Sequence, residues 1–372
     1  MSAVQGFDPR ALHAEERARR VAEEIAPRAA EVDREGRVPL ETLRALAEAG
    51  LMGVNVPAAY GGLEATTVGY SLAMQQVAKA DASVSVAMAV TNMVGEILCR
   101  FGSEVQRARY VPRLTSGEAV AGSFALSEAG SGTDAASLRT TAVRRGDHYV
   151  LNGSKMWITS GDIAGVIVVY ARTDASHKQR GISAFIVEPT FPGFHVGAHE
   201  QKMGLHGSST VGLTFEDCVV PAENLLAEEG QGFTIAMAAL DGGRIGIGSQ
   251  AVGIATGALE AAARAGAPSG AALEAIADMA TRLDAARLLV LRAAHLKDQG
   301  RRFTLEASMA KLFATESALR ICEDALRVIG AGAMSRDLPV ERLLRDVRVT
   351  SIYEGTSEVQ RIVIAREVLR GA

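Results

Sequence analysis

The spacing of apolar residues changes twice along the 372-residue chain, and these changes constrain the fold more than any other feature. From about residue 8 to 118 apolar residues recur at intervals of three and four, as in VGYSLAMQQVAKADASVSVAMAVTNMVGEILCRFG, which indicates helices. Residues 119–228 instead contain short β-branched and aromatic runs such as AGVIVVYARTD and GISAFIVEP, bounded by turn residues, which indicates strands. After EEGQGF the helical spacing returns and continues to the end of the chain.

We therefore predict an α+β protein with three domains. The N-terminal all-α domain covers 1–118, the central β domain 119–228 and the C-terminal helical bundle 229–372. A chain of this length is expected to divide, because single hydrophobic cores usually stop growing before that size. Several helical stretches of more than twenty residues after position 228, joined by short loops, are typical of a bundle.

Composition excludes several classes of protein. Apolar residues make up 48% and charged residues 22% of the chain, and the net charge of -4 argues against a nucleic-acid surface. Cys99, Cys218 and Cys322 are scattered, so we expect neither a disulfide framework nor a cysteine metal site, and a reducing cytoplasm fits best. The charged N-terminus lacks the apolar core of a secretory signal, and we expect no apolar run long enough to span a membrane.

The stretch TSIYEGTSEVQRIVIAR at 350–366 places one acid, Glu354, between a tyrosine and a glycine. Ser357 and Gln360 form a capping-box pattern, so we expect a helix to begin just after Gly355 and Glu354 to lie in the preceding turn. An acid before a helix N-terminus is favoured by the helix dipole alone. The stretch by itself leaves that explanation and a functional carboxylate both open.

Two stretches of the β region could hold a ligand. In FALSEAGSGTDAA at 124–136, the small residues 130–133 could form a nest of backbone N–H groups for a phosphate, or an ordinary β-turn. In KMWITSG, Trp157 and Thr159 are two positions apart in a strand, so both side chains should lie on one face and could hold a flat heteroaromatic ring. A core tryptophan is the alternative explanation.

Metal and hydrolase chemistry find no support in the sequence. His195, His199 and His206 cluster in FHVGAHEQKMGLH, but their spacing matches no familiar zinc pattern and no cysteine or acid pair completes a ligand set. The chain has no GxSxG elbow. We therefore expect no metal site and no Ser-His-Asp triad.

Taken together, the stretches resemble the acyl-CoA dehydrogenase family of flavoenzymes over nearly the whole chain. The likeness is carried by GLMGVNVPAAYGGLEATTVGYSLAMQQVAKADASVSV, FALSEAGSGTD, NGSKMWITSG, LDGGRIGIGSQAVGIA and YEGTSEVQRIVIAR, in this order. The resemblance implies an N-terminal helical domain, a central β domain and a C-terminal four-helix bundle. It also implies FAD bound between the β domain and the bundle.

The resemblance implies a role for each of several residues. Glu354 matches the catalytic base. The positions that match acyl-CoA contacts are Thr133, Asp241, Arg244, Tyr353 and Gly355. The positions implied to contact FAD are Phe124, Leu126, Ser127, Gly132, Thr133, Trp157, Ile158, Thr159, Arg327, Gly330, Thr356 and Glu358, with Thr159 near flavin N5.

The chemistry that the resemblance implies explains why one acid suffices. Removing a proton beside a thioester generates charge on the carbonyl oxygen, so the site needs a base and hydrogen-bond donors at that oxygen. The resemblance assigns these roles to the Glu354 carboxylate, the Glu354 backbone N–H and a flavin hydroxyl, with the β-hydride passing to the flavin. Some relatives carry the base at the position that Gly243 occupies here. This chain has no acid at that position, which favours a straight-chain short or medium acyl substrate.

The chain departs from the family near residues 264–272, where a segment that reaches the FAD of a neighbouring subunit is missing. Arg327 stands where relatives have a neutral glutamine, and it could replace the lost positive charge. We expect a homotetramer, a dimer of dimers, that passes electrons to an electron-transferring flavoprotein. The alternatives are an acyl-CoA oxidase and a flavin-poor, non-catalytic relative that binds an acyl-CoA or another ligand on the same scaffold.

Overall fold

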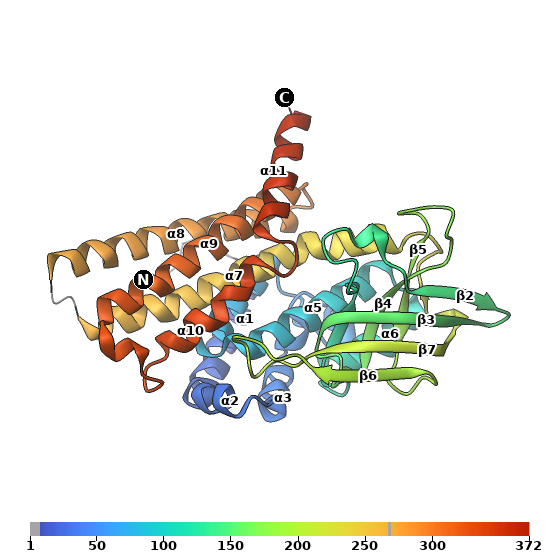
Figure 1. Cartoon of the computed structure of the whole chain (residues 1–372), viewed down its shortest axis with the longest axis horizontal. Helices are drawn as coiled ribbons and strands as arrows, with labels where there is room; N and C mark the ends of the chain where they lie inside the picture. The colour runs from blue at the N-terminus through green and yellow to red at the C-terminus, as the bar shows by residue number, and fades with distance from the viewer. Residues whose placement is uncertain (1–7, 267–268, 372) are drawn as a thin grey trace.

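The computed structural model describes residues 8–266 and 269–371, and Figure 1 shows a β-sheet at one end of an elongated set of helices. The N-terminal helices are α1 (Pro9–Ile25), α2 (Ala29–Glu35), α3 (Leu40–Glu48), α4 (Thr67–Ala80), α5 (Ala82–Phe101) and α6 (Glu104–Thr115). The strands are β1 (Gly122–Ala125), β2 (Thr141–Arg145), β3 (His148–Thr159), β4 (Val166–Arg172), β5 (Ile182–Val187), β6 (Phe194–His199), β7 (Thr210–Pro221) and β8 (Leu225–Leu226). The C-terminal helices are α7 (Gly232–Ala265), α8 (Gly270–Asp298), α9 (Thr304–Ile329), α10 (Val340–Val347) and α11 (Ser357–Gly371). The predicted α+β class and its helix, strand, helix order are confirmed.

The strands form one eight-stranded mixed sheet with the order β6-β7-β3-β2-β4-β5-β8, and β1 pairs in parallel with β4. β4 and β5 are buried at almost every position, as expected for central strands covered on both faces. β3 pairs with β7 along its whole length, but the register shifts between Lys155 and Ile158. This bulge re-aims the side chains at the end of β3, where a candidate ligand stretch lies.

The long helices α7, α8 and α9 pack against one another to form the bundle, and α10 packs on α9 and α7. α7 has 34 residues, which corresponds to about 50 Å, and it begins beside the sheet and ends at the opposite end of the molecule (Figure 1). Helix α4 of the N-terminal part also packs on α7 and α8. Helix α11 does not lie along the bundle but projects away from it (Figure 1).

The expectation that no segment is long and apolar enough to span a membrane is wrong for α5. This helix has 20 residues and a mean hydropathy of 1.5 in its most apolar window, of which 89% is buried inside the fold. α5 packs on α4, α6, α7 and β1. Its apolar composition therefore fits a core helix that contacts other elements on all sides.

The N-terminal helices are joined to the sheet through Gln106. Its side-chain Oε1 accepts from the Ser103 N–H at 3.0 Å and completes a capping box at the start of α6. Its Nε2 donates to the carbonyls of Glu223 and Leu225, at 2.7 and 2.8 Å. One buried amide thus caps a helix and holds the segment that leads into β8.

Gln106→Ala should lower the free energy of unfolding by about 1–3 kcal/mol, because a buried side chain and its hydrogen bonds to two partly buried carbonyls are lost. Denaturant unfolding followed by circular dichroism measures this change. Gln179→Ala, at an exposed position, is the matched control and should be close to neutral. Equal stability of the two variants would show that Gln106 does not hold this junction.

Candidate active site

Glu354 lies in a turn between the short helical turn Arg348–Ser351 and α11. Its backbone has φ of 53°, the left-handed region, and Gly355 follows with φ of 95°. Lys311 on α9 holds this turn, since its buried Nζ donates to the carbonyls of Thr350 and Gly355 at 3.0 and 2.9 Å. An unusual backbone geometry for a glutamate is thus maintained from both ends by one ammonium group.

The predicted helix start after Gly355 is correct, but the predicted capping box is wrong. The Thr356 hydroxyl, not that of Ser357, accepts from a helix N–H, that of Val359 at 3.4 Å. The Gln360 side chain donates to the Gly355 carbonyl at 2.9 Å instead of closing a capping box. Ser357 is the first helical residue, and its buried hydroxyl has no partner among the described residues.

The Glu354 carboxylate is placed in an apolar setting without compensation by hydrogen bonds. Its Oε2 is buried and has no hydrogen-bond partner among the described residues. Burial raises the pKa of Glu354 from 4.5 to about 7, and the charges of Lys311 and Arg244 lower it by a smaller amount. A carboxyl group whose pKa lies near neutrality is suited to take up a proton at pH 7.

Gly243 on α7 lies directly against this carboxylate. A Cβ atom at position 243 would lie 1.9 Å from Oε2 of Glu354, which is a severe overlap. The absence of an acid at Gly243, noted in the sequence, therefore has a steric counterpart: with Glu354 oriented as it is, a side chain at position 243 would have to displace the carboxylate. The two positions share one volume.

Arg244 and Asp241, both predicted to contact substrate, lie together on α7. Arg244 donates to Asp241 at 2.6 Å and to Ser308 at 3.2 Å, and Thr304 donates to the other Asp241 oxygen at 2.7 Å. The Arg244 Nε is buried and has no partner among the described residues. This guanidinium is oriented through its Nη1, and its buried Nε–H stays unpaired among the described residues.

The structure adds two residues to this site that the sequence reasoning did not find. Lys311 stands in the buried stripe of α9 formed by Ala307, Ala310, Ala314 and Ala318, and a lysine within such a stripe is the signal that could have identified it. Gln250 accepts a hydrogen bond from the Tyr353 hydroxyl. Tyr353, predicted to contact substrate, thus has its hydroxyl engaged by α7.

The two candidate ligand stretches of the β domain are brought together. The Met156 N–H donates to the Ser127 carbonyl at 2.9 Å, and the Ser123 hydroxyl donates to the Thr159 carbonyl at 2.7 Å. The buried Lys155 ammonium and Glu128 carboxylate form an ion pair at 2.8 Å between the two stretches. The loop after β1 and the end of β3 therefore form one continuous surface.

Trp157 is not a core residue, so that alternative is wrong. Its side chain is 55% exposed and its backbone, in the β3 bulge, has φ of 62°. Ile158 is buried in the sheet core, and Thr159 is partly exposed. This alternation supports a shared face for Trp157 and Thr159, and it leaves Ile158 only its backbone for ligand contact.

The other predicted cofactor residues of this region differ in what they expose. Phe124 packs on Tyr170 with ring centroids 5.0 Å apart, and Leu126 is buried in the same cluster. Gly132 and Thr133 are exposed, and a Cβ at Gly132 would meet no heavy atom of the described residues within 4 Å. The small-residue loop therefore offers open backbone, which is what a phosphate-binding nest requires.

Four further residues predicted to bind FAD lie elsewhere. Arg327 and Gly330 are at the C-terminal end of α9, the end of the bundle away from the sheet (Figure 1). Arg327 is exposed and pairs with Asp324 at 2.6 Å, so its charge is partly engaged. Thr356 caps α11 and Glu358 is exposed in its first turn. One chain alone does not bring Arg327 and Gly330 to the Trp157 surface.

The three clustered histidines each contact a different acid. His199 lies 3.1 Å from Asp162, His206 2.9 Å from Asp33 and His195 3.8 Å from Glu216. Residues 8–266 and 269–371 contain no group of three His, Cys, Asp or Glu side chains arranged to hold a metal ion.

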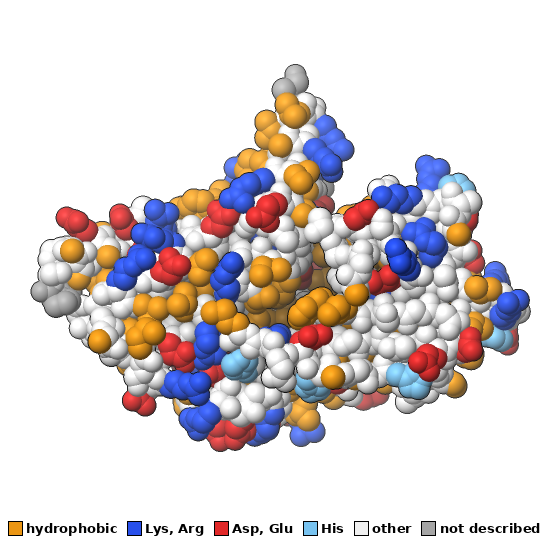
Figure 2. All heavy atoms as spheres, in the orientation of Figure 1, with side chains coloured by type: hydrophobic (Ala, Val, Ile, Leu, Met, Phe, Trp, Pro, Cys, Tyr) orange, Lys and Arg blue, Asp and Glu red, His pale blue; other side chains and the backbone are white. Residues whose placement is uncertain are grey.

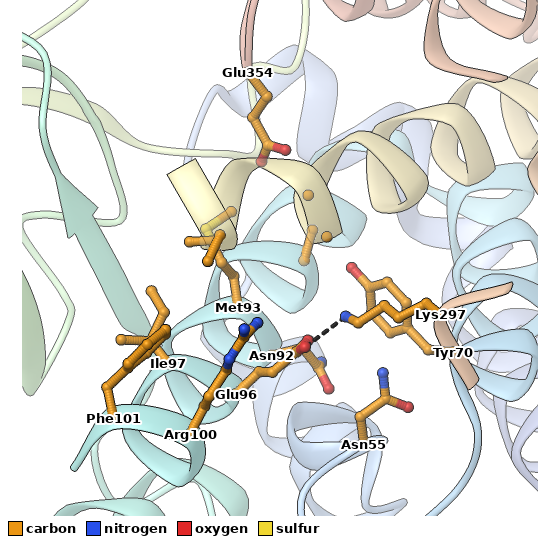
Figure 3. Close-up of a pocket in the computed structure, with 15 residues that line it drawn as sticks. Asn55, Tyr70, Asn92, Met93, Glu96, Ile97, Arg100, Phe101, Lys297 and Glu354 are labelled. Carbon is orange, nitrogen blue, oxygen red and sulfur yellow. Dashed lines mark ion pairs between the residues drawn. The ribbon is translucent and has the colours of Figure 1, made fainter. Parts of the chain in front are cut away.

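A small pocket of about 30 Å³ connects Glu354 to the N-terminal helices. Figure 3 shows the Glu354 carboxylate pointing toward α7, with an ion pair between Glu96 and Lys297 beyond it. The lining comes from α4, α5, α7, the end of α8, the Glu354 turn and Asn55, and includes Tyr70, Met93, Ile97 and Gly243. Figure 2 shows hydrophobic side chains around a hollow between the bundle and the sheet on one face of the molecule.

Comparison with known proteins agrees with this geometry. The N-terminal, middle and C-terminal domains of acyl-CoA dehydrogenase match residues 10–118, 123–218 and 230–369. The chain therefore belongs to the acyl-CoA dehydrogenase family.

Individual relatives are similar over almost their whole length. The mitochondrial short-chain specific acyl-CoA dehydrogenase of Mus musculus is 46% identical over 93% of this chain and 87% of its own. Butyryl-CoA dehydrogenase from Megasphaera elsdenii has a TM-score of 0.95 at 38% identity, covering 100% of both chains. A chain in a structure of the electron transferring flavoprotein of Acidaminococcus fermentans has a TM-score of 0.97 at 40% identity, covering 99% of this chain and 100% of that one.

Gly243→Ala should destabilise the fold by an amount at the low end of about 1–3 kcal/mol, because its Cβ overlaps the end of the Glu354 side chain, which must rotate away. In a Glu354→Ala background the same substitution should cost much less, because the overlapping atoms are gone. A double-mutant cycle from denaturant unfolding measures this coupling. Gly332→Ala is the control, since a Cβ there meets no described heavy atom within 4 Å. An unchanged Gly243→Ala penalty in both backgrounds would contradict the packing.

Proposed function

We propose that the chain is an FAD-dependent acyl-CoA dehydrogenase of the short-chain type that converts an acyl-CoA to the trans-2-enoyl-CoA. The observation that carries the proposal is the buried carboxylate of Glu354, which lacks a hydrogen-bond partner among the described residues and has a pKa of about 7. A structural acid would be paired or solvated, whereas a base for a weakly acidic C–H group must keep a free lone pair. The membership of the family supports this assignment.

The residues present fit FAD. The exposed Trp157 and the partly exposed Thr159 can hold a flat ring and a hydrogen-bonding edge, and the open loop at Gly132 and Thr133 can hold a diphosphate. When bound, FAD supplies the acceptor for the hydride that leaves the β-carbon. The Glu128–Lys155 pair keeps the loop and the strand end in register for that ligand.

The residues of the chain provide the proton chemistry. The Glu354 carboxylate takes the α-proton of the thioester, and its own backbone N–H, which makes no hydrogen bond to the described residues, donates to the thioester oxygen as negative charge develops there. Lys311 and Arg244 limit the rise in the pKa of Glu354, so that the carboxylate is available near neutral pH. Lys311 also fixes the turn that presents both groups.

The size of the pocket supports a short acyl chain. The cavity of about 30 Å³ beside Glu354 is small, and Glu96 and Lys297 form part of its wall, which suits a short acyl chain. The similarity to short-chain specific and butyryl-CoA dehydrogenases points the same way. The absence of an acid at Gly243 supports a straight chain.

The proposal also covers assembly, location and electron acceptor. We expect the protein to form a homotetramer in the cytoplasm and to pass its electrons to an electron-transferring flavoprotein. Helix α11 projects from the body and exposes Ile362, Val368 and Leu369 at 49%, 51% and 76%, which suits contact with another copy. Arg327 and Gly330 could contact FAD only from a neighbouring subunit. The three free cysteines fit a reducing compartment, and the similarity to a chain in an electron transferring flavoprotein structure supports the acceptor.

The function is tested by anaerobic titration of the FAD-loaded protein with butyryl-CoA. We expect the flavin absorbance to bleach, and we expect Glu354→Gln to bind the substrate but to be reduced ~10²–10⁴-fold more slowly, as is typical for loss of a positioned base. Rapid reoxidation of the reduced protein by oxygen alone would favour the oxidase. A protein that stays colourless with excess FAD would favour the non-catalytic relative.

The pH dependence follows from the raised pKa of Glu354. An acid is the active base only when ionised, so kcat/KM should rise about tenfold per pH unit below pH 7 and level off above it. The sign for stability is opposite: the folded pKa exceeds the unfolded one, so this group destabilises the fold as pH rises from 4.5 through about 7. Initial rates between pH 5.5 and 9 measure the profile, and a midpoint near 4.5 would contradict the burial of the carboxylate.

A further inference from the structure

The far end of the acyl pocket is polar, although the chain that enters it is expected to be hydrocarbon. Lys297, at the end of α8, and Glu96, on α5, form an ion pair at 2.5 Å with side chains 16% and 37% exposed. Both line the same pocket as Glu354 (Figure 3). A wall that only limited chain length could be made of Leu or Phe, whereas two charged groups give this end of the pocket a hydrogen-bonding capacity that a hydrocarbon chain would not use.

Tyr70 adds a second polar group at this place. The residue is 7% exposed, lines the pocket, and its hydroxyl makes no hydrogen bond to the described residues. The hydroxyl packs on the bare backbone of Gly246, where a Cβ would lie 2.7 Å away. A phenol hydroxyl that lines a pocket and has no partner among the described residues is available to bond a ligand that enters the pocket.

Two adjacent glycines of α7 lie against the two charged parts of the pocket, the Lys297–Glu96 ion pair and the Glu354 carboxylate. A Cβ at Gly243 would meet Glu354, and a Cβ at Gly242 would meet the Lys297 Nζ at 3.1 Å and Glu96 at 3.9 Å. The Cα atoms of neighbouring residues are about 3.8 Å apart. The base and the ion pair therefore both lie against one short stretch of α7 and line one pocket, in which a substrate held at Glu354 can extend its acyl chain toward the ion pair.

We propose, on the basis of the function above, that the preferred substrate is a short acyl-CoA with a neutral hydroxyl group at the distal end of its acyl chain. The hydroxyl lies between the Lys297–Glu96 ion pair and the Tyr70 hydroxyl. It donates to the Glu96 carboxylate or to Tyr70, and it accepts from the Lys297 ammonium. Each polar group of the pocket end then has a partner in the complex.

A hydroxyl fits this site better than a methyl or a carboxylate. A methyl group would cover the ion pair and the phenol without giving either a hydrogen bond, and such mismatches are strongly rejected by polar sites. A carboxylate would compete with Glu96 for Lys297 and would lie near a second acid, Glu354. The one further cation of the lining, Arg100, is exposed and stacks on Phe101 at 5.0 Å.

The test compares 4-hydroxybutyryl-CoA with pentanoyl-CoA, which has a methyl in place of the hydroxyl, and with succinyl-CoA. We expect kcat/KM of the FAD-loaded enzyme to be at least roughly tenfold higher for 4-hydroxybutyryl-CoA than for pentanoyl-CoA. Equal or better turnover of pentanoyl-CoA, or a preference for succinyl-CoA, overturns the proposal. This ratio uses the unaltered protein and does not depend on the folding of a variant.

Variants of the polar pocket residues test whether these residues cause the preference for 4-hydroxybutyryl-CoA over pentanoyl-CoA. Lys297→Met with Glu96→Leu removes both charges together, so that no unpaired buried charge remains, and should reverse the preference in favour of pentanoyl-CoA. Tyr70→Phe should reduce the preference part of the way. The control is Lys79→Met with Glu260→Leu, which removes an ion pair of 3.2 Å outside the pocket and should keep the ratio. An unchanged ratio in all variants overturns the assignment.

A binding measurement separates this proposal from the function on which it rests. In Glu354→Gln, which cannot take the α-proton, calorimetry should still give a dissociation constant several-fold lower for 4-hydroxybutyryl-CoA than for pentanoyl-CoA. Butyryl-CoA turnover by the unaltered enzyme without discrimination between these two ligands overturns the hydroxyl proposal alone. Absence of turnover with every acyl-CoA, butyryl-CoA included, overturns the proposed function.

Discussion

The active-site geometry depends on the burial of one carboxylate that the protein does not hydrogen-bond. Ionising such a group is unfavourable, and the structure tolerates it because Lys311 and Arg244 lie close enough to offset part of the cost without pairing directly with it. Lys311 uses its hydrogen bonds on the carbonyls of Thr350 and Gly355, so it fixes the backbone and leaves the Glu354 oxygens free. A direct ion pair would lower the pKa and occupy the lone pair that the base needs.

The need to keep the Glu354 oxygens free also explains why α7 carries two glycines beside the site. Gly242 and Gly243 present bare backbone, the first toward Lys297 and the second toward Glu354. Glycine in a helix is unfavourable by up to about 1 kcal/mol relative to alanine, so two in succession indicate that the space is needed. The long, alanine-rich bundle that surrounds them supplies a rigid support on which these positions are held.

The sequence predicted the Glu354 turn but not the side chains that hold its backbone in place. Its location before a helix could be read from Gly355 and the following apolar spacing. The capping pattern suggested Ser357 and Gln360, whereas Thr356 caps the helix and Gln360 contacts the Gly355 carbonyl. Capping motifs fit several registers one residue apart, and tertiary contacts with the turn selected between them. The sequence did not decide whether Trp157 lies in the core or on the surface, because the alternation of residues in a strand does not reveal a β-bulge.

Apolar spacing, turn residues and long ordered motifs in the sequence determined the α+β class and the order of helices and strands, because these depend on local preferences and on which faces must be buried. Tertiary structure decided the rest of the site. Five different helices supply Lys311, Gly243, Tyr70, Glu96 and Lys297, and nothing in their local sequence shows that they converge around Glu354. Convergence depends on how α4, α5, α7, α8 and α9 pack, and burial, which shifts the pKa of Glu354, exists only after that packing is complete.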